Sequence, residues 1–299
     1  MWLKFALLNT LRNRRRSLVT VSIAALGTAG ILLAGGFALY TYEALAEAAA
    51  RDSGHLVMAK PEHFTKDEET PLQHGLDNAA ELKAQLMIDP AVRAVLPRVE
   101  FSGLISNGDK STVMIGVGVE PDSEFSIKGP FLTLKAGDVL ATGSKEPEVM
   151  LGDVLARNLK ATPGSSLTLL ASTTEGALNA LDVRVKAVFS TGMPDVDKRL
   201  VYTDIATAQK LLNTPRVSSL GVFLSHMEMT FPAQVRLAGA NPKLTVQTWQ
   251  DQAFFYKSVR DLYNRIFGAL GLIIGVIVVF VVTNAMSMAI IERTREIGT

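Results

Sequence analysis

Two long stretches without a charged side chain determine how this chain is organised: LVTVSIAALGTAGILLAGGFALY at residues 18–40 and IFGALGLIIGVIVVFVVTNAMSMAII at residues 266–291. They contain 23 and 26 residues. A helix rises about 1.5 Å per residue, so each stretch is longer than the roughly 30 Å hydrocarbon core of a bilayer. The sequence therefore predicts two transmembrane helices, with a large segment between them.

Basic residues orient the first helix. Five of them, and no acidic residue, precede it: Lys4, Arg12, Arg14, Arg15 and Arg16. Under the positive-inside rule, this bias predicts a cytoplasmic N-terminus. Residues 1–17 also place most of their apolar side chains on one helical face, which predicts an interfacial amphipathic helix on the cytoplasmic leaflet. A cleavable signal peptide is the alternative, but a run of 23 residues exceeds the roughly 7–15 of a signal's apolar core.

Composition excludes several classes of protein. The chain has 299 residues, no cysteine, a net charge of +1 and 20% charged residues. Without cysteine there is no disulfide framework, thiolate metal site or cysteine nucleophile. A near-zero net charge is also atypical of a nucleic-acid-binding domain, so no nucleic-acid partner is expected.

Residues 41–248 are predicted to form an α+β domain. The segment is long enough for one large or two small domains, and the pattern favours two lobes. Alternating or β-branched runs predict strands at 55–59, 95–106, 112–119, 166–171, 183–189, 200–203 and 220–224. Helical patterns occur at 77–87, 153–160 and 204–212. The Pro- and Gly-rich stretch 120–147 predicts either a linker between the lobes or long loops within one lobe.

The segment before the second span predicts a long helix. Thr248 and Asp251 form a variant of the capping box, with aspartate in the place of the usual glutamate. No proline occurs from Trp249 to Glu296. We therefore expect one continuous helix, with a stalk at 249–265, the second span at 266–291 and the start of a cytoplasmic coupling segment at 292–299.

Local patterns of catalytic chemistry are absent from the sequence. It has no GxxxxGK[ST], HExxH or GxSxG motif, and its four histidines show no paired ligand spacing. Asp195 and Asp197 could bind a cation, but the pattern of a calcium loop does not continue, and a solvated turn is the favoured interpretation. We predict no catalytic, cofactor or metal site, and no enzyme activity of this chain.

The tail ERTREIG at residues 292–298 follows the second span. On charge alone, its alternating residues are typical of an anchor at the lipid headgroups. The tail also resembles an element of the MacB/FtsX/LolC/LolE permeases, the mechanotransmission family of ABC transporter membrane subunits. Similar matches, in the family's order, are LLNTLRNRRRSLVTVSIAALGTAGILLAGG (7–36), IGVGVEPDSEF (115–125), EVMLGDVLARNLKATPGSSLTL (148–169) and VFSTGMPDVDKRLVYTDIATAQKLL (188–212).

This resemblance implies a periplasmic domain with a porter-like lobe and a smaller β-rich lobe between two spans of a bacterial inner-membrane protein. It implies a coupling role toward a cytoplasmic ABC ATPase, which would bind the ATP, for Glu292, Arg293, Arg295, Glu296 and Gly298. It also implies a second permease subunit, as a homo- or heterodimer, and a periplasmic or outer-membrane partner. Because such permeases have four spans, the chain is expected to be truncated after its second.

The resemblance predicts a permease subunit that exports or releases a lipoprotein, lipid, peptide or hydrophobic drug. Two other classes of function stay open. One is a transmembrane regulator of a periplasmic cell-wall hydrolase, which would use ATP-driven motion without transport. The other is a two-span membrane-anchored sensor or adaptor that needs no ATPase.

Overall fold

The computed structural model describes residues 14–65, 70–128, 132–144 and 146–297. Most of the amphipathic helix predicted at 1–17 lies outside these residues. The helices are α2 (Arg14–Ser53), α3 (Pro61–Thr65), α4 (Ala79–Leu86), α5 (Pro121–Lys128), α6 (Asp153–Leu159), α7 (Pro194–Asp197), α8 (Ile205–Leu212), the 3-10 helix η1 (Met227–Met229), α9 (Thr230–Ala240), α10 (Trp249–Gln252) and α11 (Phe254–Ile297). The strands are β1 (Leu56–Ala59), β2 (Val92–Ser106), β3 (Ser111–Val119), β4 (Thr133–Gly137), β5 (Glu148–Gly152), β6 (Ser166–Ser172), β7 (Leu178–Ser190), β8 (Leu200–Asp204), β9 (Ser219–Leu224) and β10 (Thr245–Thr248).

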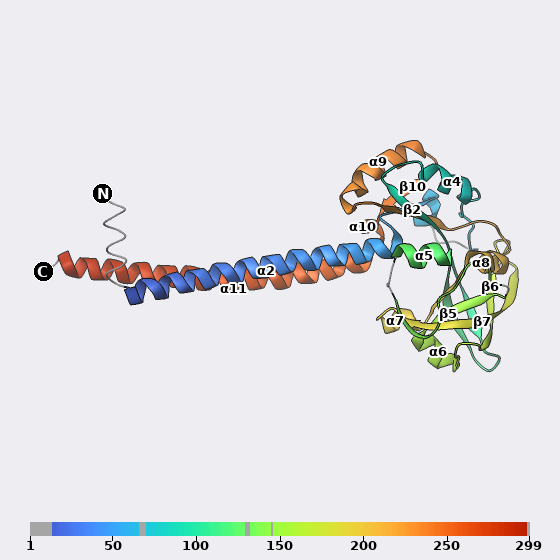
Figure 1. Ribbon diagram of the computed structural model, residues 1–299, viewed down its shortest axis with the longest axis horizontal. Helices are drawn as coiled ribbons and strands as arrows, with labels where there is room; N and C mark the ends of the chain where they lie inside the picture. The colour runs from blue at the N-terminus through green and yellow to red at the C-terminus, as the bar shows by residue number, and fades with distance from the viewer. Residues whose placement is uncertain (1–13, 66–69, 129–131, 145, 298–299) are drawn as a thin grey trace. The chain divides into compact units, whose positions relative to one another are not determined.

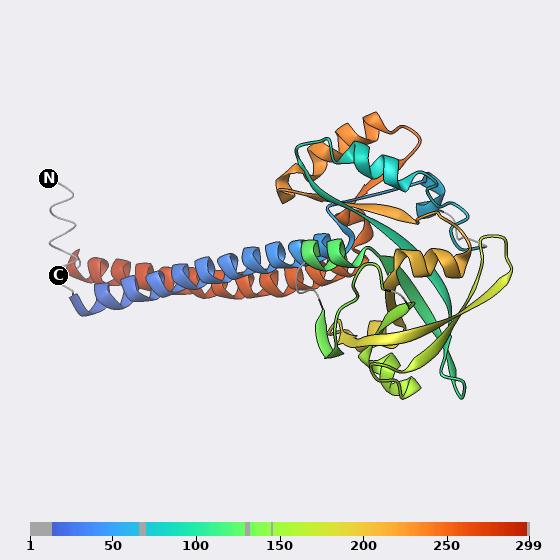
Figure 2. The ribbon, with the colours of Figure 1, turned by 45° about the vertical axis from the view of Figure 1, so that its right-hand side comes forward.

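The chain divides into two compact units. The first unit contains residues 1–46 and 254–299, and the second contains residues 47–253. In the first unit, α2 and α11 run side by side (Figures 1 and 2). The Tyr42 hydroxyl donates to Asn264 Oδ1 at 2.6 Å, and the Phe37 and Tyr42 rings meet Phe267 edge to face. Both helices are long and apolar enough to cross a membrane, with candidate spans at Ala25–Ser53 and Tyr256–Asn284.

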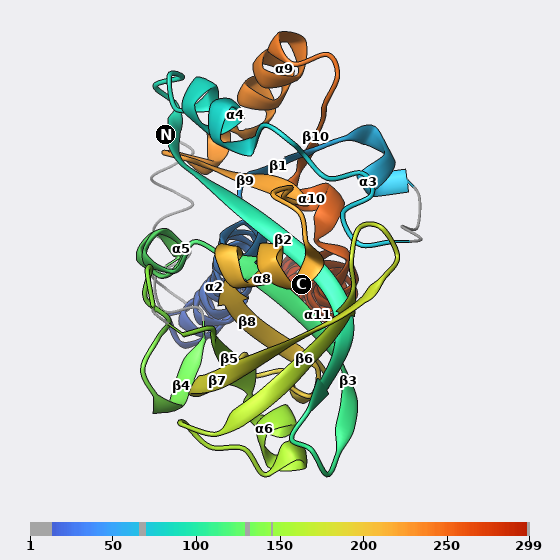
Figure 3. The same ribbon diagram turned by 90° about the vertical axis from the view of Figure 1, so that its right-hand side faces the viewer.

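The long strand β2 organises the second unit by changing partners along its length. Its first part, Val92–Arg98, pairs antiparallel with β9, and its second part, Val99–Ser106, pairs antiparallel with β3. We call the part of the unit built on the first segment lobe 1 and the part built on the second segment lobe 2. Figure 3 shows β2 passing from one lobe into the other.

Lobe 1 contains an antiparallel sheet in the order β10-β1-β9-β2. All six residues of β9 are buried, as expected of a central strand with both faces covered. Helices α4 and α9 lie next to each other in this lobe (Figure 3), where Arg236 of α9 pairs with Asp89 just beyond α4 at 2.9 Å. Lobe 1 is thus a layered α/β structure.

Lobe 2 is a closed barrel. Its strands pair in the ring β2-β3-β8-β5-β7-β6, and β6 pairs with both β7 and β2 to complete the circle. Strand β4 adds to β7 outside the ring. Closure leaves the ring without a free edge, which removes a surface prone to aggregation.

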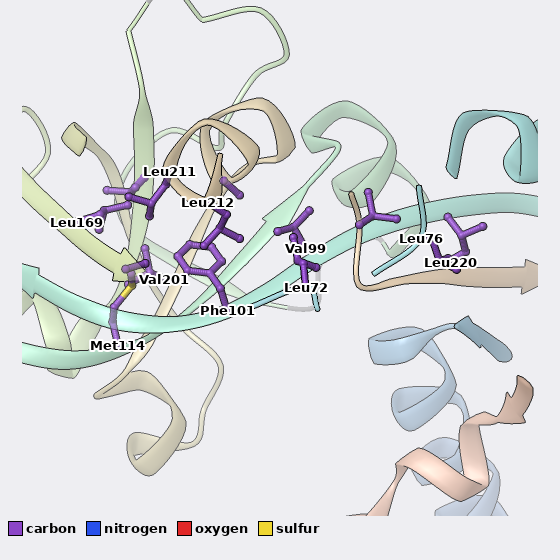
Figure 4. Packing of buried hydrophobic residues seen from close by; sticks show 14 of the residues in the cluster. Leu72, Leu76, Val99, Phe101, Met114, Leu169, Val201, Leu211, Leu212 and Leu220 are labelled. Carbon is purple, nitrogen blue, oxygen red and sulfur yellow. The ribbon is translucent and has the colours of Figure 1, made fainter. Parts of the chain in front are cut away.

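One hydrophobic core follows β2 through both lobes. Leu76 and Leu220 fill it in lobe 1, and Met114 and Leu169 fill it in lobe 2, each at most 1% exposed (Figure 4). Fully burying a side chain of this size contributes roughly 1.5–3 kcal/mol. The shared core explains why the two lobes form a single compact unit.

The structure corrects two of the sequence-based expectations. The stretch 120–147 does not link the lobes, because β3 before it and β5 after it both belong to the barrel of lobe 2; it forms α5 and β4, and β4 pairs with β7. The continuous helix expected from Trp249 is wrong as well. Ala253, with φ −85° and ψ 69°, interrupts it between α10 and α11. The predicted capping box is confirmed, with Thr248 N–H donating to Asp251 Oδ2 at 2.9 Å.

Candidate functional site

The end of α2 enters the second unit through a tight, glycine-dependent turn. Gly54 follows the helix with a φ of +99°, and its N–H donates to the Ala50 carbonyl at 2.9 Å. A β-carbon at Gly54 would lie 3.0 Å from the Val222 backbone nitrogen, and one at Gly221 would lie 2.7 Å from the Ser53 carbonyl oxygen. Glycine at both positions therefore lets the helix end pack directly on strand β9.

A buried arginine holds this helix end. Arg98 is the last residue of β2 that pairs with β9. It therefore lies where the strand passes from lobe 1 to lobe 2. Its Nη2 donates to the Asp52 carbonyl in the last turn of α2 and to Glu124 Oε1 of α5 at 3.3 Å. Arginine suits a helix C-terminus because the last carbonyls lack partners within the helix. We call Arg98, Glu124 and the Asp52 carbonyl the clamp.

Burial makes the clamp sensitive to change. The side chains of Arg98 and Glu124 are only 10% and 1% exposed. Burial acts to lower the pKa of Arg98, but the negative charges of Glu124 and Asp52 outweigh it and raise the pKa above its ordinary value. The guanidinium therefore stays charged, and a buried charge requires its partner.

The same region contains a cavity of about 540 Å³. It is lined by residues of α2, α5, β2, β9 and η1, by one residue before β1 and by two between β9 and η1: Glu47, Ala50, Arg51, His55, Arg93, Ser126, Ile127, Phe223, Leu224, Ser225, His226 and Met227. His55 Nδ1 accepts from Leu224 N–H at 3.2 Å, which assigns the ring proton of the neutral form to Nε2. Burial lowers the pKa of His55, although the Glu47 carboxylate opposes this change.

Asp195 and Asp197 differ in their surroundings. Asp195 is exposed and pairs with Lys198 at 2.6 Å, as a solvated turn requires. Asp197 is instead buried, and its carboxylate accepts from the Ser190 hydroxyl and from the backbone and hydroxyl of Thr191 at 2.7–2.9 Å. For Asp197 the prediction of a solvated turn is wrong, because its carboxylate organises the loop between β7 and β8. Among the described residues, no group of three His, Asp or Glu could hold a metal ion.

The predicted coupling residues lie at the C-terminal end of α11 and just beyond it. Glu292, Arg293, Arg295 and Glu296 belong to the last turns of α11, and Gly298 lies outside the described residues. The helical continuation past the second span agrees with the expectation. The contact of these residues with an ATPase stays a prediction.

Sequence reasoning missed the clamp and the cavity. The available clue was that Arg98 lies within VRAVLPRVEF (92–101), a run whose apolar residues predict a buried strand. A charged residue is rarely fully buried without a partner, so such a position indicates a buried ion pair. The partner could not be identified, because Glu124 lies 26 residues away on another element.

A mixed α/β domain lies in the chain between two apolar helices that are long enough to span a membrane, which is the arrangement expected of a membrane protein with a large extramembrane domain. A family model described as the MacB-like periplasmic core domain matches residues 17–244, and the chain belongs to this family. The predicted resemblance to permeases of the MacB and LolC/LolE type is thereby confirmed.

Similar proteins cover most of the chain. The lipoprotein-releasing system transmembrane protein LolC of Xylella fastidiosa is 23% identical over 298 residues, which cover 97% of this chain and 71% of that protein. The corresponding LolE of Haemophilus influenzae is 25% identical over 227 residues, which cover 73% of this chain and 54% of that protein. The crystal structure of the periplasmic region of MacB from Actinobacillus actinomycetemcomitans has a TM-score of 0.48 at 16% identity, covering 66% of this chain and 89% of that one.

Proposed function

We propose that this chain is the membrane-spanning permease subunit of an ABC transporter that releases lipoproteins from the inner membrane. The observation that supports this proposal best is the similarity to a lipoprotein-releasing transmembrane protein along 97% of the chain, together with the family match at residues 17–244. In this proposal a separate cytoplasmic ATPase binds and hydrolyses ATP, and a second permease subunit completes the membrane part.

The clamp gives the proposal a physical route for coupling. α2 is one uninterrupted helix from Arg14 to Ser53, and its last turn is held by Arg98 at the junction of the two lobes. Motion of α2 along or about its axis would therefore act on that junction directly. ATP-driven closure of the partner subunits is proposed to move α2 and α11 and so to change the arrangement of the lobes.

Charge reversal of the tail tests the proposed ATPase contact. A variant with Glu292→Lys, Arg293→Glu, Arg295→Glu and Glu296→Lys should lose co-purification with the ATPase subunit from detergent-solubilised membranes of its own cells. The matched control reverses Asp261→Lys and Arg265→Glu near the other end of α11 and should retain the ATPase. Unchanged recovery of the ATPase with the tail variant would show that the assigned contact is wrong.

The release activity needs its own measurement. Proteoliposomes containing the chain, its partner subunits and a lipoprotein should release that lipoprotein to a soluble acceptor only when ATP is present. Failure of an intact, ATP-hydrolysing complex to release any lipoprotein offered would contradict the proposed substrate while leaving the ATPase contact standing.

A further inference from the structure

The cavity beside the end of α2 combines cationic groups with an apolar wall. Arg51 of α2 and Arg93 of β2 line it together with His55 and His226, against a single carboxylate, that of Glu47. Ser126 and Ser225 add hydroxyl groups, and the side chains of Ile127, Phe223 and Met227 supply apolar surface. Such a lining suits a ligand that is anionic at one end and apolar at the other.

The two arginines are available for a ligand. Both side chains are exposed, and neither makes a hydrogen bond or ion pair with any part of the chain that the structure describes. Other arginines of the same unit are paired, including Arg98, Arg157, Arg184 and Arg216. An unpaired guanidinium offers donors in a fork that matches the oxygens of a phosphate.

His55 adds a neutral donor to this group. Its Nδ1 already accepts from Leu224 N–H, so its Nε2–H is the ring atom that can donate to a ligand. The Phe223 ring packs edge to face against the imidazole and fixes its orientation. The donor is therefore held in place before any ligand arrives.

The position of the cavity along α2 indicates where its ligand comes from. Arg51 follows Tyr42 by nine residues, or about 14 Å of helix. The helix between Ser17 and Tyr42 has no charged residue, and Tyr40 and Tyr42 are typical of the boundary between membrane and water. The candidate span extends to Ser53, but its uncharged part ends at Tyr42, so Arg51 is expected at the headgroup level, where its flexible side chain can extend into the polar region.

We propose that this cavity binds the phosphate of an anionic phospholipid headgroup, held between Arg51 and Arg93, with the start of the acyl chains against Phe223 and Ile127. The inference goes beyond the proposed transport function, since it needs neither an ATPase nor a lipoprotein. A lipid bound here would join the end of α2 to strand β2 and helix α5 at the membrane surface.

Titration with a short-chain lipid tests the proposal. The full chain in uncharged maltoside micelles should broaden the ³¹P signal of dihexanoylphosphatidylglycerol in a saturable way. Arg51→Gln and Arg93→Gln should each weaken binding by about tenfold or more, as expected for a lost charge-assisted hydrogen bond, and the double variant should abolish it. Arg199→Gln, at an exposed arginine outside the cavity, is the matched control and should bind as the parent does.

Competitors distinguish the source of the phosphate. Dihexanoylglycerol, which lacks the phosphate, should not displace the lipid, and inorganic phosphate should displace it only at much higher concentration. Displacement by inorganic phosphate at the lipid's own concentration would overturn the assignment to a headgroup. Retained lipid binding in the double variant, with the parent's melting temperature, would overturn the site. If the double variant unfolds, the lipid affinities of the two single variants still test the site.

Discussion

Replacing Arg98 by methionine should destabilise the second unit by about 3–5 kcal/mol, the cost of leaving a buried charge without its partner. Methionine keeps much of the apolar stem, so loss of packing is small. The Glu124 carboxylate stays buried, with its side chain 1% exposed, but loses the guanidinium. The Asp52 carbonyl at the end of α2 also loses a donor, which adds about 1 kcal/mol.

Urea unfolding of the full chain in detergent micelles measures this loss. With Trp2→Phe as the background, fluorescence reports on Trp249 alone, whose residue is 4% exposed in the folded chain. The double variant Arg98→Met/Glu124→Leu removes both charges. It should recover most of the stability, because an apolar pair of similar volume often replaces a buried ion pair without loss. Arg157→Met breaks the more exposed pair with Asp153 and should cost about 0–1 kcal/mol.

The free energy of unfolding of the double variant shows whether the charge or the shape of Arg98 stabilises the chain. If Arg98→Met changes the free energy of unfolding by less than about 1 kcal/mol, Arg98 does not hold the helix end. If the double variant is as unstable as the single one, the loss comes from packing and the electrostatic reasoning is refuted.

Asp197 and His55 give two further predictions. Asp197→Ala should cost about 3 kcal/mol, because three donors of Ser190 and Thr191 lose a buried acceptor, whereas Asp195→Ala at the exposed position should change the urea midpoint far less. The lowered pKa of His55 should make stability fall as the pH drops below about 6.5, because the unfolded chain then binds the proton more readily than the folded one. The variant His55→Gln should therefore show a smaller difference in urea midpoint between pH 7.5 and pH 5 than the parent chain. The other charged or titratable residues of the cavity, Arg51, Arg93, His226 and Glu47, are the same in the parent and the variant. An equal pH dependence in His55→Gln would assign the effect to another group.

Local patterns predicted the features that depend on neighbours in sequence. The two spans follow from uncharged runs, and α8 begins where Asp204 caps it, with Thr207 N–H donating to Asp204 Oδ1 at 2.9 Å. Helix α9 was not predicted, and it contains Pro232 and Gly239, two residue types that are unfavourable in a helix interior. Proline is nevertheless compatible with the first turn of a helix, where the missing N–H has no intrahelical partner.

Features that depend on distant pairing could not be predicted. The barrel closes because β6 pairs with β2 about 65 residues earlier in the chain, with Leu104 opposite Leu170. The joint at Ala253 carries no local breaker, since alanine is the best helix former. β10 pairs with β1, and Trp249, the first residue of α10, is buried. These tertiary contacts hold the start of α10 in place and override the helix propensity of Ala253.

The two long helices are thus attached to the second unit in different ways. α2 passes into β1 through Ser53 and Gly54, and the clamp holds its carbonyl end at the place where β2 leaves lobe 1 for lobe 2. α11 is separated from β10 by the short helix α10 and the non-helical Ala253, whose backbone dihedrals can change without breaking a long hydrogen-bonded ladder. Under the proposed function, α2 would therefore transmit force to the lobe junction, while Ala253 would allow α11 to follow by rotation. A mechanical subunit needs both properties, because two rigid attachments would resist the rearrangement that the ATPase is proposed to drive.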